Sequence, residues 1–147
     1  MNSTCCPLPA NPPTERHPVF EYLLCAFLSC APTGTTINAA SIYVVDGDTI
    51  KINEQSYRLL GYDTPETYRA DCPEEKALGM AATKRLRDLI DAAQTVTLDT
   101  TGKPDKYRRV LAHLNLDGVD VGQSLIGENL AVPYDGGKRI SWCDVLR

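Results

Sequence analysis

The sequence predicts a mainly β domain of the α+β class, a small five-stranded barrel with one helix inserted after the third strand and a short C-terminal helix. Two patterns lead to this prediction. From residue 41 onward, β-branched runs alternate with turn residues, which is typical of short strands. After the third run, apolar residues recur at helical spacing. At 147 residues, 43% of them hydrophobic and 23% charged, the chain has room for one such domain with a small core.

Three short strands open the domain. The first two are β-branched runs over 42–45 and 49–52, and a third run covers 56–60. Asp46-Gly47 and Asn53-Glu54 form the turns that separate them. The pattern therefore predicts three consecutive strands joined by tight turns.

A long helix is predicted over 74–93. Pro73, Glu74 and Glu75 suit its first turn. The apolar positions that recur at helical spacing are Leu78, Ala82, Leu86, Leu89 and Ala93.

Two further strands are predicted over 95–98 and 110–116, with a polar loop over 100–108 between them. A short helix over 121–129 follows, and Asn129 could close it in a left-handed conformation. This order of three strands, helix, two strands and helix is that of a five-stranded barrel with an inserted helix.

The first forty residues differ in composition from the remainder, and we predict a signal peptide there, with the domain over 41–147. An apolar run over 22–31 has the length of a signal-peptide hydrophobic region, and is shorter than the roughly 20 residues that span a bilayer. Because Glu21 interrupts the pattern, a disordered extension or a misplaced start codon is the alternative. We expect an exported monomer, periplasmic or secreted, without a stable membrane span. A degraded cleavage motif at Phe27-Leu28-Ser29-Cys30 also allows a membrane-anchored lipoprotein.

Six cysteines are spread unevenly, and two of them, Cys72 and Cys143, lie beyond residue 40. The sequence has no CxxC pair and only two histidines, which argues against a zinc site. If the N-terminal region is removed on export, a disulfide between Cys72 and Cys143 would suit an oxidising compartment. Two free thiols in a reducing cytoplasm are the alternative.

The net charge of −4 argues against a broad, non-specific coat that binds nucleic acid. The segment over 95–113 is nevertheless basic. It carries four cationic side chains against two carboxylates, namely Lys103, Lys106, Arg108 and Arg109 against Asp99 and Asp105. Charge is therefore segregated along the chain, which leaves room for a local basic cleft.

Three aspartates form a candidate metal site. Asp46 and Asp48 are two residues apart, so they point the same way if a strand begins there. Asp63 lies just past the third predicted strand, where an adjacent loop could bring it to the same ion. Carboxylate oxygens suit calcium or magnesium, and an EF-hand is excluded because no glutamate follows at the required interval. Taken singly, each aspartate is also a common turn former.

A carboxylate and two arginines complete the candidate site. Glu66 could orient a metal-bound water or take its proton, or could be an exposed residue of a first helical turn. Arg58 lies in a strand-like run where an unpaired guanidinium would be costly to bury, so it should face an anion in a cleft or pair with Asp63 or Glu66. Arg109 could clamp a phosphate bidentately. Two arginines opposite a divalent cation suit the charge that develops during phosphodiester cleavage.

From about residue 42 to residue 142 the chain resembles the thermonuclease, or staphylococcal nuclease-like, family. The resemblance rests on DGDT at 46–49, RLLGYDTPE at 58–66, DKYRRVLA at 105–112 and a GxNLA-type segment at 127–131. It implies an OB-fold barrel with added helices, which agrees with the element order above. It also implies calcium-dependent hydrolysis of DNA and RNA with little sequence specificity, leaving 3′-phosphates.

The resemblance further implies which residues bind the metal and activate water. Asp48 and Asp63 would ligate one calcium ion together with the backbone carbonyl of Thr64. Asp46 would lie in the outer shell of ligands. Glu66 would be the general base or the residue that positions the water.

The same resemblance implies how the substrate is held. Arg58 and Arg109 would bind the scissile phosphate, whereas Arg108 stands where the family pattern Asp-Lys-Tyr-Gly-Arg has glycine. Contacts to the neighbouring phosphate, sugar and base would come from Lys106, Tyr107 and Tyr134.

The sequence also allows alternatives to the nuclease. A non-catalytic OB-fold module that binds nucleic acid would be expected to have lost Glu66 or an arginine, and none is lost. A glycosidase with Asp63 and Glu66 as its acid and base would leave Arg58 and Arg109 without a role. His113 could act as a general base, although its place within a predicted strand favours a structural role.

Overall fold

The computed structural model describes residues 34–146, and every structural statement below concerns that part of the chain. Most of the predicted signal peptide, including the lipoprotein-like motif, lies outside the described residues. No helix in the described range combines the length and apolar character needed to cross a membrane.

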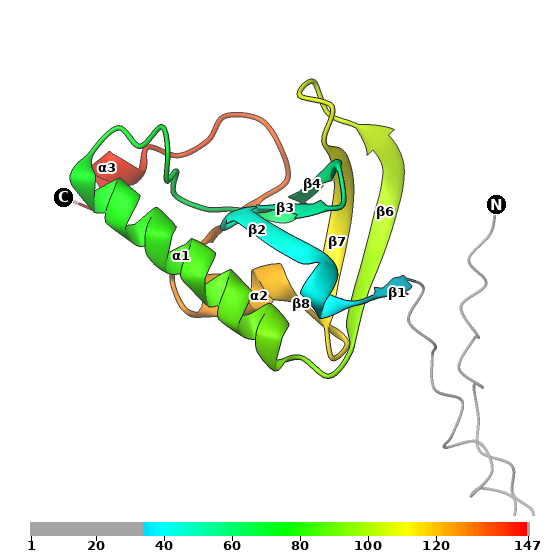
Figure 1. Ribbon diagram of the computed structural model, residues 1–147. Coiled ribbons are helices and arrows are strands. Elements are labelled where there is room, and N and C mark those ends of the chain that lie inside the picture. Colours follow the sequence, from blue (N-terminus) through cyan, green and yellow to red (C-terminus); the bar gives the residue numbers. More distant parts are fainter. Residues whose placement is uncertain (1–33, 147) are drawn as a thin grey trace, which may run out of the picture. The chain divides into compact units, whose positions relative to one another are not determined.

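One sheet of seven strands forms the main part of the fold (Figure 1). Its strands, in chain order, are β1 (Thr35–Ile37), β2 (Ile42–Asp46), β3 (Thr49–Ile52), β4 (Gln55–Leu59), β6 (Val96–Pro104), β7 (Val110–Leu116) and β8 (Val119–Asp120). A second sheet pairs β5 (Gly61–Asp63) with β9 (Val132–Tyr134). The helices are the 3-10 turn η2 (Ala39–Ser41) and the α-helices α1 (Pro73–Ala92), α2 (Val121–Gly127) and α3 (Trp142–Val145).

The large sheet is open. Its strands follow the order β1-β6-β7-β4-β3-β2, with β8 paired to β7, and among the described strands only β4 and β7 run parallel. Within the described residues no ladder joins β1 to β2, which are the two end strands of the sheet, and the short turn η2 lies between them in the chain. The mainly β class with an inserted helix and a C-terminal helix is confirmed, whereas the expected closure into a five-stranded barrel is not observed.

The elements that rest on clear sequence patterns lie close to their predicted positions. This holds for β2, β3, β4, α1, β7 and α2. Asn129 has the predicted left-handed conformation, with φ at 59°. The elements of the described range that were not predicted are β1, η2, β5, β8, β9 and α3, each only two to four residues long and so too short to show periodicity.

The prediction of a polar loop over 100–108 is wrong for residues 100–104, which belong to a strand. β6 continues to Pro104 and pairs with β7, from Thr100 opposite Ala112 to Pro104 opposite Val110, across a register shift. Beyond Leu98 every side chain of β6 is exposed, so this ribbon lacks the one-sided apolar alternation by which a strand is recognised.

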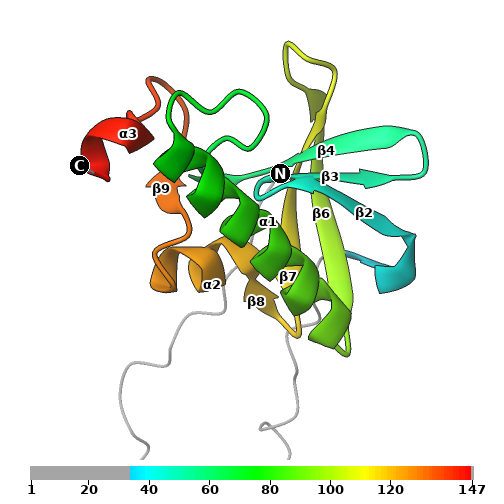
Figure 2. The same ribbon diagram turned by 60° about the vertical axis from the view of Figure 1, so that its left-hand side comes forward.

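The core lies between the large sheet and the helices α1 and α2. Its fully buried side chains include Ile50, Leu59, Leu86, Leu114 and Leu125. Helix α1 packs against β2, α2 and α3. Figures 1 and 2 both show α3 beside the first turn of α1, so the end of the described chain returns to the start of this helix.

Four segments that are distant in the sequence meet at one place. They are the β2–β3 turn at 46–49, the β4–β5 connection at 58–63, the β6–β7 turn at 105–109 and the segment at 134–139 after β9. Ion pairs and hydrogen bonds join the first segment to the second, the first to the third and the second to the fourth. All residues of the candidate site lie on or next to these segments.

Candidate active site

Arg58 joins the two aspartates that were predicted to bind metal. Its Nη2 lies 3.1 Å from Asp48 Oδ2 and 3.2 Å from Asp63 Oδ1. The guanidinium also donates hydrogen bonds to the backbone carbonyls of Leu59 and Tyr62. Only 7% of the Arg58 side chain and 2% of the Asp63 side chain are exposed. The pairing of Arg58 with Asp63, one of the two arrangements left open by the sequence, is therefore present, and Arg58 also borders the cleft described below.

Burial disfavours the charged form of two carboxylates in this cluster. Desolvation, together with the nearby charge of Asp48, raises the pKa of Asp46 to about 6. Burial also raises the pKa of Asp63 to about 6, although Arg139 and Arg58 act in the opposite direction. A cation bound between these groups would compensate the excess negative charge.

The donor atoms available here are oxygens, which is the ligand type that calcium prefers. Asp46 Oδ1 accepts the backbone N–H of Asp48 at 3.2 Å, so Asp46 supports the neighbouring carboxylate. Thr64 is 3% exposed and packs against the β2–β3 turn, where a Cβ atom on Gly47 would approach its side chain to 2.8 Å. The oxygen donors and the unbalanced charge fit a hard divalent cation. Within 34–146, however, the aspartates do not bring three ligand atoms within 4.8 Å of one another, so they would have to close around the ion.

The backbone of Glu66 is held in place by Glu75, which lies in the first turn of α1. The Glu75 carboxylate is buried and accepts the backbone N–H groups of Glu66, at 3.3 Å, and Asp71, at 2.8 Å. It thereby ties both ends of the loop over 66–71 to the helix. The Glu66 side chain is 40% exposed and faces the same region as Asp63, because both pair with Arg139.

Arg139 is a site residue that the sequence analysis missed. Its Nε lies 3.0 Å from Asp63 Oδ1, and its Nη1 forms an ion pair with Glu66 Oε1. Arg139 follows Glu66 by 73 residues, so no motif spacing connects the two. The one signal in the sequence is its position in a short basic stretch after two glycines.

Arg109 is oriented by Asp105. Its Nε and Nη2 lie 2.9 Å and 2.8 Å from Asp105 Oδ2. Burial acts to raise the pKa of Asp105, but hydrogen bonds from Arg109 and from the backbone of Tyr107 outweigh it and lower that pKa. Arg109 also donates to the Thr49 hydroxyl at 3.1 Å, which in turn donates to Asp48 at 2.9 Å. The predicted phosphate clamp is therefore linked directly to the aspartate cluster.

A cleft of about 1350 Å³ opens beside these groups. Five cationic side chains and three carboxylates line it, namely Arg58, Arg69, Lys106, Arg109 and Arg139 with Glu66, Asp105 and Asp135. The surface of the cleft is therefore basic although the chain as a whole is acidic.

The residues predicted to contact the substrate border this cleft too. Tyr107 is 67% exposed, and the Lys106 ammonium lies 5.0 Å from the centre of its ring. The Tyr134 hydroxyl donates to the backbone carbonyl of Gly137 at 2.9 Å. His113 is also in the lining, with Nδ1 3.2 Å from Asp120 Oδ2.

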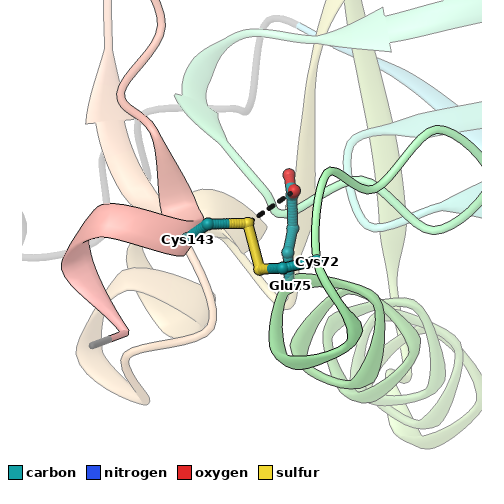
Figure 3. Close-up of side chains that lie close together, drawn as sticks. All are labelled: Cys72, Glu75 and Cys143. Atoms are coloured by element: carbon teal, nitrogen blue, oxygen red, sulfur yellow. Dashed lines mark hydrogen bonds between the residues drawn. A yellow bond between two sulfur atoms is a disulfide. The ribbon is translucent and has the colours of Figure 1, made fainter.

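A disulfide connects Cys72 with Cys143 next to the site (Figure 3). Cys72 precedes α1 and Cys143 lies in α3, so the bond fastens the C-terminal segment to the start of the long helix. Glu75 Oε2 lies 3.6 Å from the Cys143 sulfur. Cys72, Glu75 and Cys143 are close enough to share a metal ion, but the two sulfurs are bonded to each other and offer no thiolate.

Comparison with known proteins identifies the family. The model of the staphylococcal nuclease homologue family matches residues 56–140, which is more than half of the chain. The matched region contains Arg58, Asp63, Glu66, Arg109 and Arg139, and the sheet with its inserted helix agrees with the expected fold. The chain belongs to the staphylococcal nuclease homologue family.

Several curated relatives are similar to the chain. The SPbeta prophage-derived endonuclease YokF of Bacillus subtilis (strain 168) is 37% identical over 92 residues, which cover 59% of this chain and 31% of that protein. Endonuclease YncB of the same organism is 33% identical over 100 residues, covering 65% and 47%. A thermonuclease of Staphylococcus hyicus is 33% identical over 94 residues, covering 61% and 55%. The chain thus spans between about a third and about half of the length of these relatives.

Proposed function

We propose that the protein is a calcium-dependent nuclease that hydrolyses phosphodiester bonds of DNA, RNA or both with little sequence specificity. The observation that carries the proposal is the continuous network from the buried aspartates through Thr49 to Arg109 at the edge of a basic cleft. The names of the relatives, endonuclease and thermonuclease, support the same reaction.

The aspartate cluster is the part of the site that would hold calcium. Asp48, Asp63 and the backbone carbonyl of Thr64 supply the ligands, and Asp46 orients Asp48 from outside. A calcium ion held there would polarise a phosphoryl oxygen of the substrate and acidify a bound water.

The other groups of the site act on water and on the phosphate. Glu66 orients the attacking water or accepts its proton. Arg109, fixed by Asp105, binds the phosphate and stabilises the charge that develops on it. Arg58 adds a buried positive charge next to the aspartates. Attack in line with departure of the 5′-oxygen leaves products that end in 3′-phosphates.

Contacts outside the scissile phosphate determine how the strand lies in the cleft. Lys106 would contact the adjacent phosphate, and the rings of Tyr107 and Tyr134 would contact sugar and bases. Stacking on an aromatic ring tolerates any base, which accounts for little sequence specificity.

We also propose that the protein works as a monomer after export to the periplasm or the medium. The disulfide between Cys72 and Cys143 supports this location, because such bonds persist in oxidising compartments. Fractionation of cells followed by immunodetection tests it, and protein found only in the cytoplasm would contradict it.

The nuclease proposal is tested by digesting plasmid DNA and single-stranded RNA with the full disulfide-bonded chain, in calcium and in excess chelator. We expect degradation in calcium only, and products that accept a radioactive label at the 3′ end only after phosphatase treatment. Glu66→Gln and Arg109→Ala should each lower kcat/KM by at least about a hundredfold, since each removes a group that acts on the transition state. Nucleic-acid binding without cleavage under several divalent ions would instead support a non-catalytic module.

A further inference from the structure

Asp63 Oδ1 has two cationic partners of different character. Arg58 Nη2 lies 3.2 Å from this oxygen and Arg139 Nε lies 3.0 Å from it. Arg58 donates a hydrogen bond to this oxygen and Arg139 forms an ion pair with it, so two guanidinium groups occupy its surroundings. A metal ion can therefore bind this oxygen only if one guanidinium leaves.

The structure indicates which of the two leaves. The Arg58 side chain is 7% exposed and also donates to backbone carbonyls, which cannot move away from it. The Arg139 side chain is 40% exposed, and its described partners are two carboxylate side chains, those of Asp63 and Glu66. Arg139 lines the cleft and can turn into it by giving up two side-chain ion pairs, whereas Arg58 would also have to leave backbone carbonyls.

The segment that carries Arg139 is fastened at both ends and turns between them. Before it, β9 pairs with β5, with Tyr134 opposite Gly61, and after it Cys143 is bonded to Cys72. Gly136 and Gly137 have φ values of 111° and 93°, which allow the sharp turn that aims residue 139 at the site. The anchors keep the guanidinium within reach of the carboxylates after it has moved aside.

We propose that Arg139 is a resident cation that competes with the metal ion for Asp63 and Glu66. In the metal-free protein it neutralises the carboxylate that should ligate the ion and engages the carboxylate that should act on water. Binding of calcium displaces it and so frees both groups together. This inference rests on the proposed nuclease site, and it assigns to Arg139 the control of metal affinity.

Calcium binding itself, not turnover, provides the test. Isothermal titration calorimetry on the full disulfide-bonded chain at constant pH compares the wild type with Arg139→Gln. Lys138→Gln is the matched control, because it removes the same charge from the preceding residue, which has no ion pair among the described residues. Arg139→Gln should bind calcium at least about tenfold more tightly, because no guanidinium then has to leave Asp63 before the ion can bind, and the binding-competent state is always populated. Lys138→Gln should change the affinity less than twofold.

A third variant guards against loss of folding. Arg139→Lys keeps the charge but lacks the planar guanidinium whose Nε and Nη1 reach the two carboxylates, so its calcium affinity should fall between those of the wild type and Arg139→Gln. Equal affinity in the wild type, Arg139→Gln and Arg139→Lys overturns the inference, as does an effect of Lys138→Gln as large as that of Arg139→Gln. Absence of calcium binding in every variant overturns it as well.

These results separate the inference from the proposed function. Tighter calcium binding by Arg139→Gln in a protein that does not cleave nucleic acid would support the competition and contradict the nuclease. Calcium-dependent cleavage by the wild type with an unchanged calcium affinity in Arg139→Gln would do the reverse.

Discussion

Two opposing effects set the pKa of Asp63, namely burial, which raises it, and two nearby arginines, which lower it. It is 1% exposed, and burial raises its pKa to about 6 even though two arginines contact it. Its usual pKa in an unfolded chain is near 4. Because the folded pKa is the higher one, the group contributes stability that is fully present below about pH 4 and is lost as the pH rises through about 6. The charge needed to bind a metal ion therefore destabilises the metal-free fold at neutral pH.

Because the charge of Asp63 destabilises the metal-free fold at neutral pH, Asp63→Asn should be more stable than the wild type there. In excess chelator at pH 7.5, the variant should have a free energy of unfolding about 2 kcal/mol higher than the wild type, since it keeps the shape without the buried charge. The difference should shrink toward zero at pH 4.5, and calcium should stabilise only the wild type. Urea unfolding followed by Trp142 fluorescence measures all of these. A variant that is less stable than the wild type at pH 7.5 in chelator would show that the arginines outweigh burial.

At the scale of whole elements, α1 is the support on which the loop with Glu66 rests. Glu75 binds the loop by hydrogen bonds, and Gly79, one turn further on, lies directly beneath its backbone. A Cβ atom at Gly79 would lie 2.7 Å from the carbonyl oxygen of Pro65 and 2.8 Å from that of Glu66. The helix approaches the loop this closely only because residue 79 has no side chain.

Gly79→Ala should therefore displace Glu66 without touching the substrate. In a helix this change alone would stabilise by about 1 kcal/mol, but here the methyl group meets two backbone oxygens that cannot turn aside. We expect a free energy of unfolding lower by about 1 to 3 kcal/mol. We expect kcat to fall about tenfold or more, because a small misplacement of a catalytic group has a large effect on rate.

Gly127 provides the matched control, since it is also helical but a Cβ atom there would have no neighbour within 4 Å. Gly127→Ala should leave kcat unchanged and should leave stability equal or higher. Equal kcat values for Gly79→Ala and the wild type would show that α1 does not position Glu66.

Whether an element could be predicted from the sequence depends on whether one of its faces is buried. Strands β2, β3 and β4 and helix α1 have one apolar face each, and their positions could be predicted from periodicity. The outer part of β6 could not, because Asp99 and the residues up to Pro104 are exposed on both faces and owe their conformation to pairing with β7. Pairing between distant segments leaves no local pattern when neither face is buried.

At the scale of the whole molecule, the disulfide determines how the C-terminal segment meets the rest of the domain. Cys72 and Cys143 are 71 residues apart, and the bond places α3 beside the first turn of α1. It also holds the segment with Arg139 next to the loop with Glu66. Most of the described chain therefore lies within one closed loop.

Cys72→Ser combined with Cys143→Ser should lower the free energy of unfolding by about 4 kcal/mol, because a long loop is no longer closed in the unfolded chain. Chemical unfolding of the variant and the wild type, each with and without reductant, measures this. Reductant should bring the wild type to the level of the variant and leave the variant unchanged. A loss below about 1 kcal/mol would mean that α3 is held by packing of Trp142, which is 6% exposed.

The sequence by itself determined the local parts of this protein, and the tertiary structure decided how they are combined. The short motifs place Asp48, Asp63 and Glu66 close together along the chain, and for that reason the carboxylates could be predicted. Arg139 could not, because it is brought to Asp63 by a glycine turn and a disulfide that act over more than seventy residues. The raised pKa values likewise depend on burial, which exists only after the segments have met. Residue type and spacing can be read from the chain, whereas contact and desolvation are properties of the folded molecule.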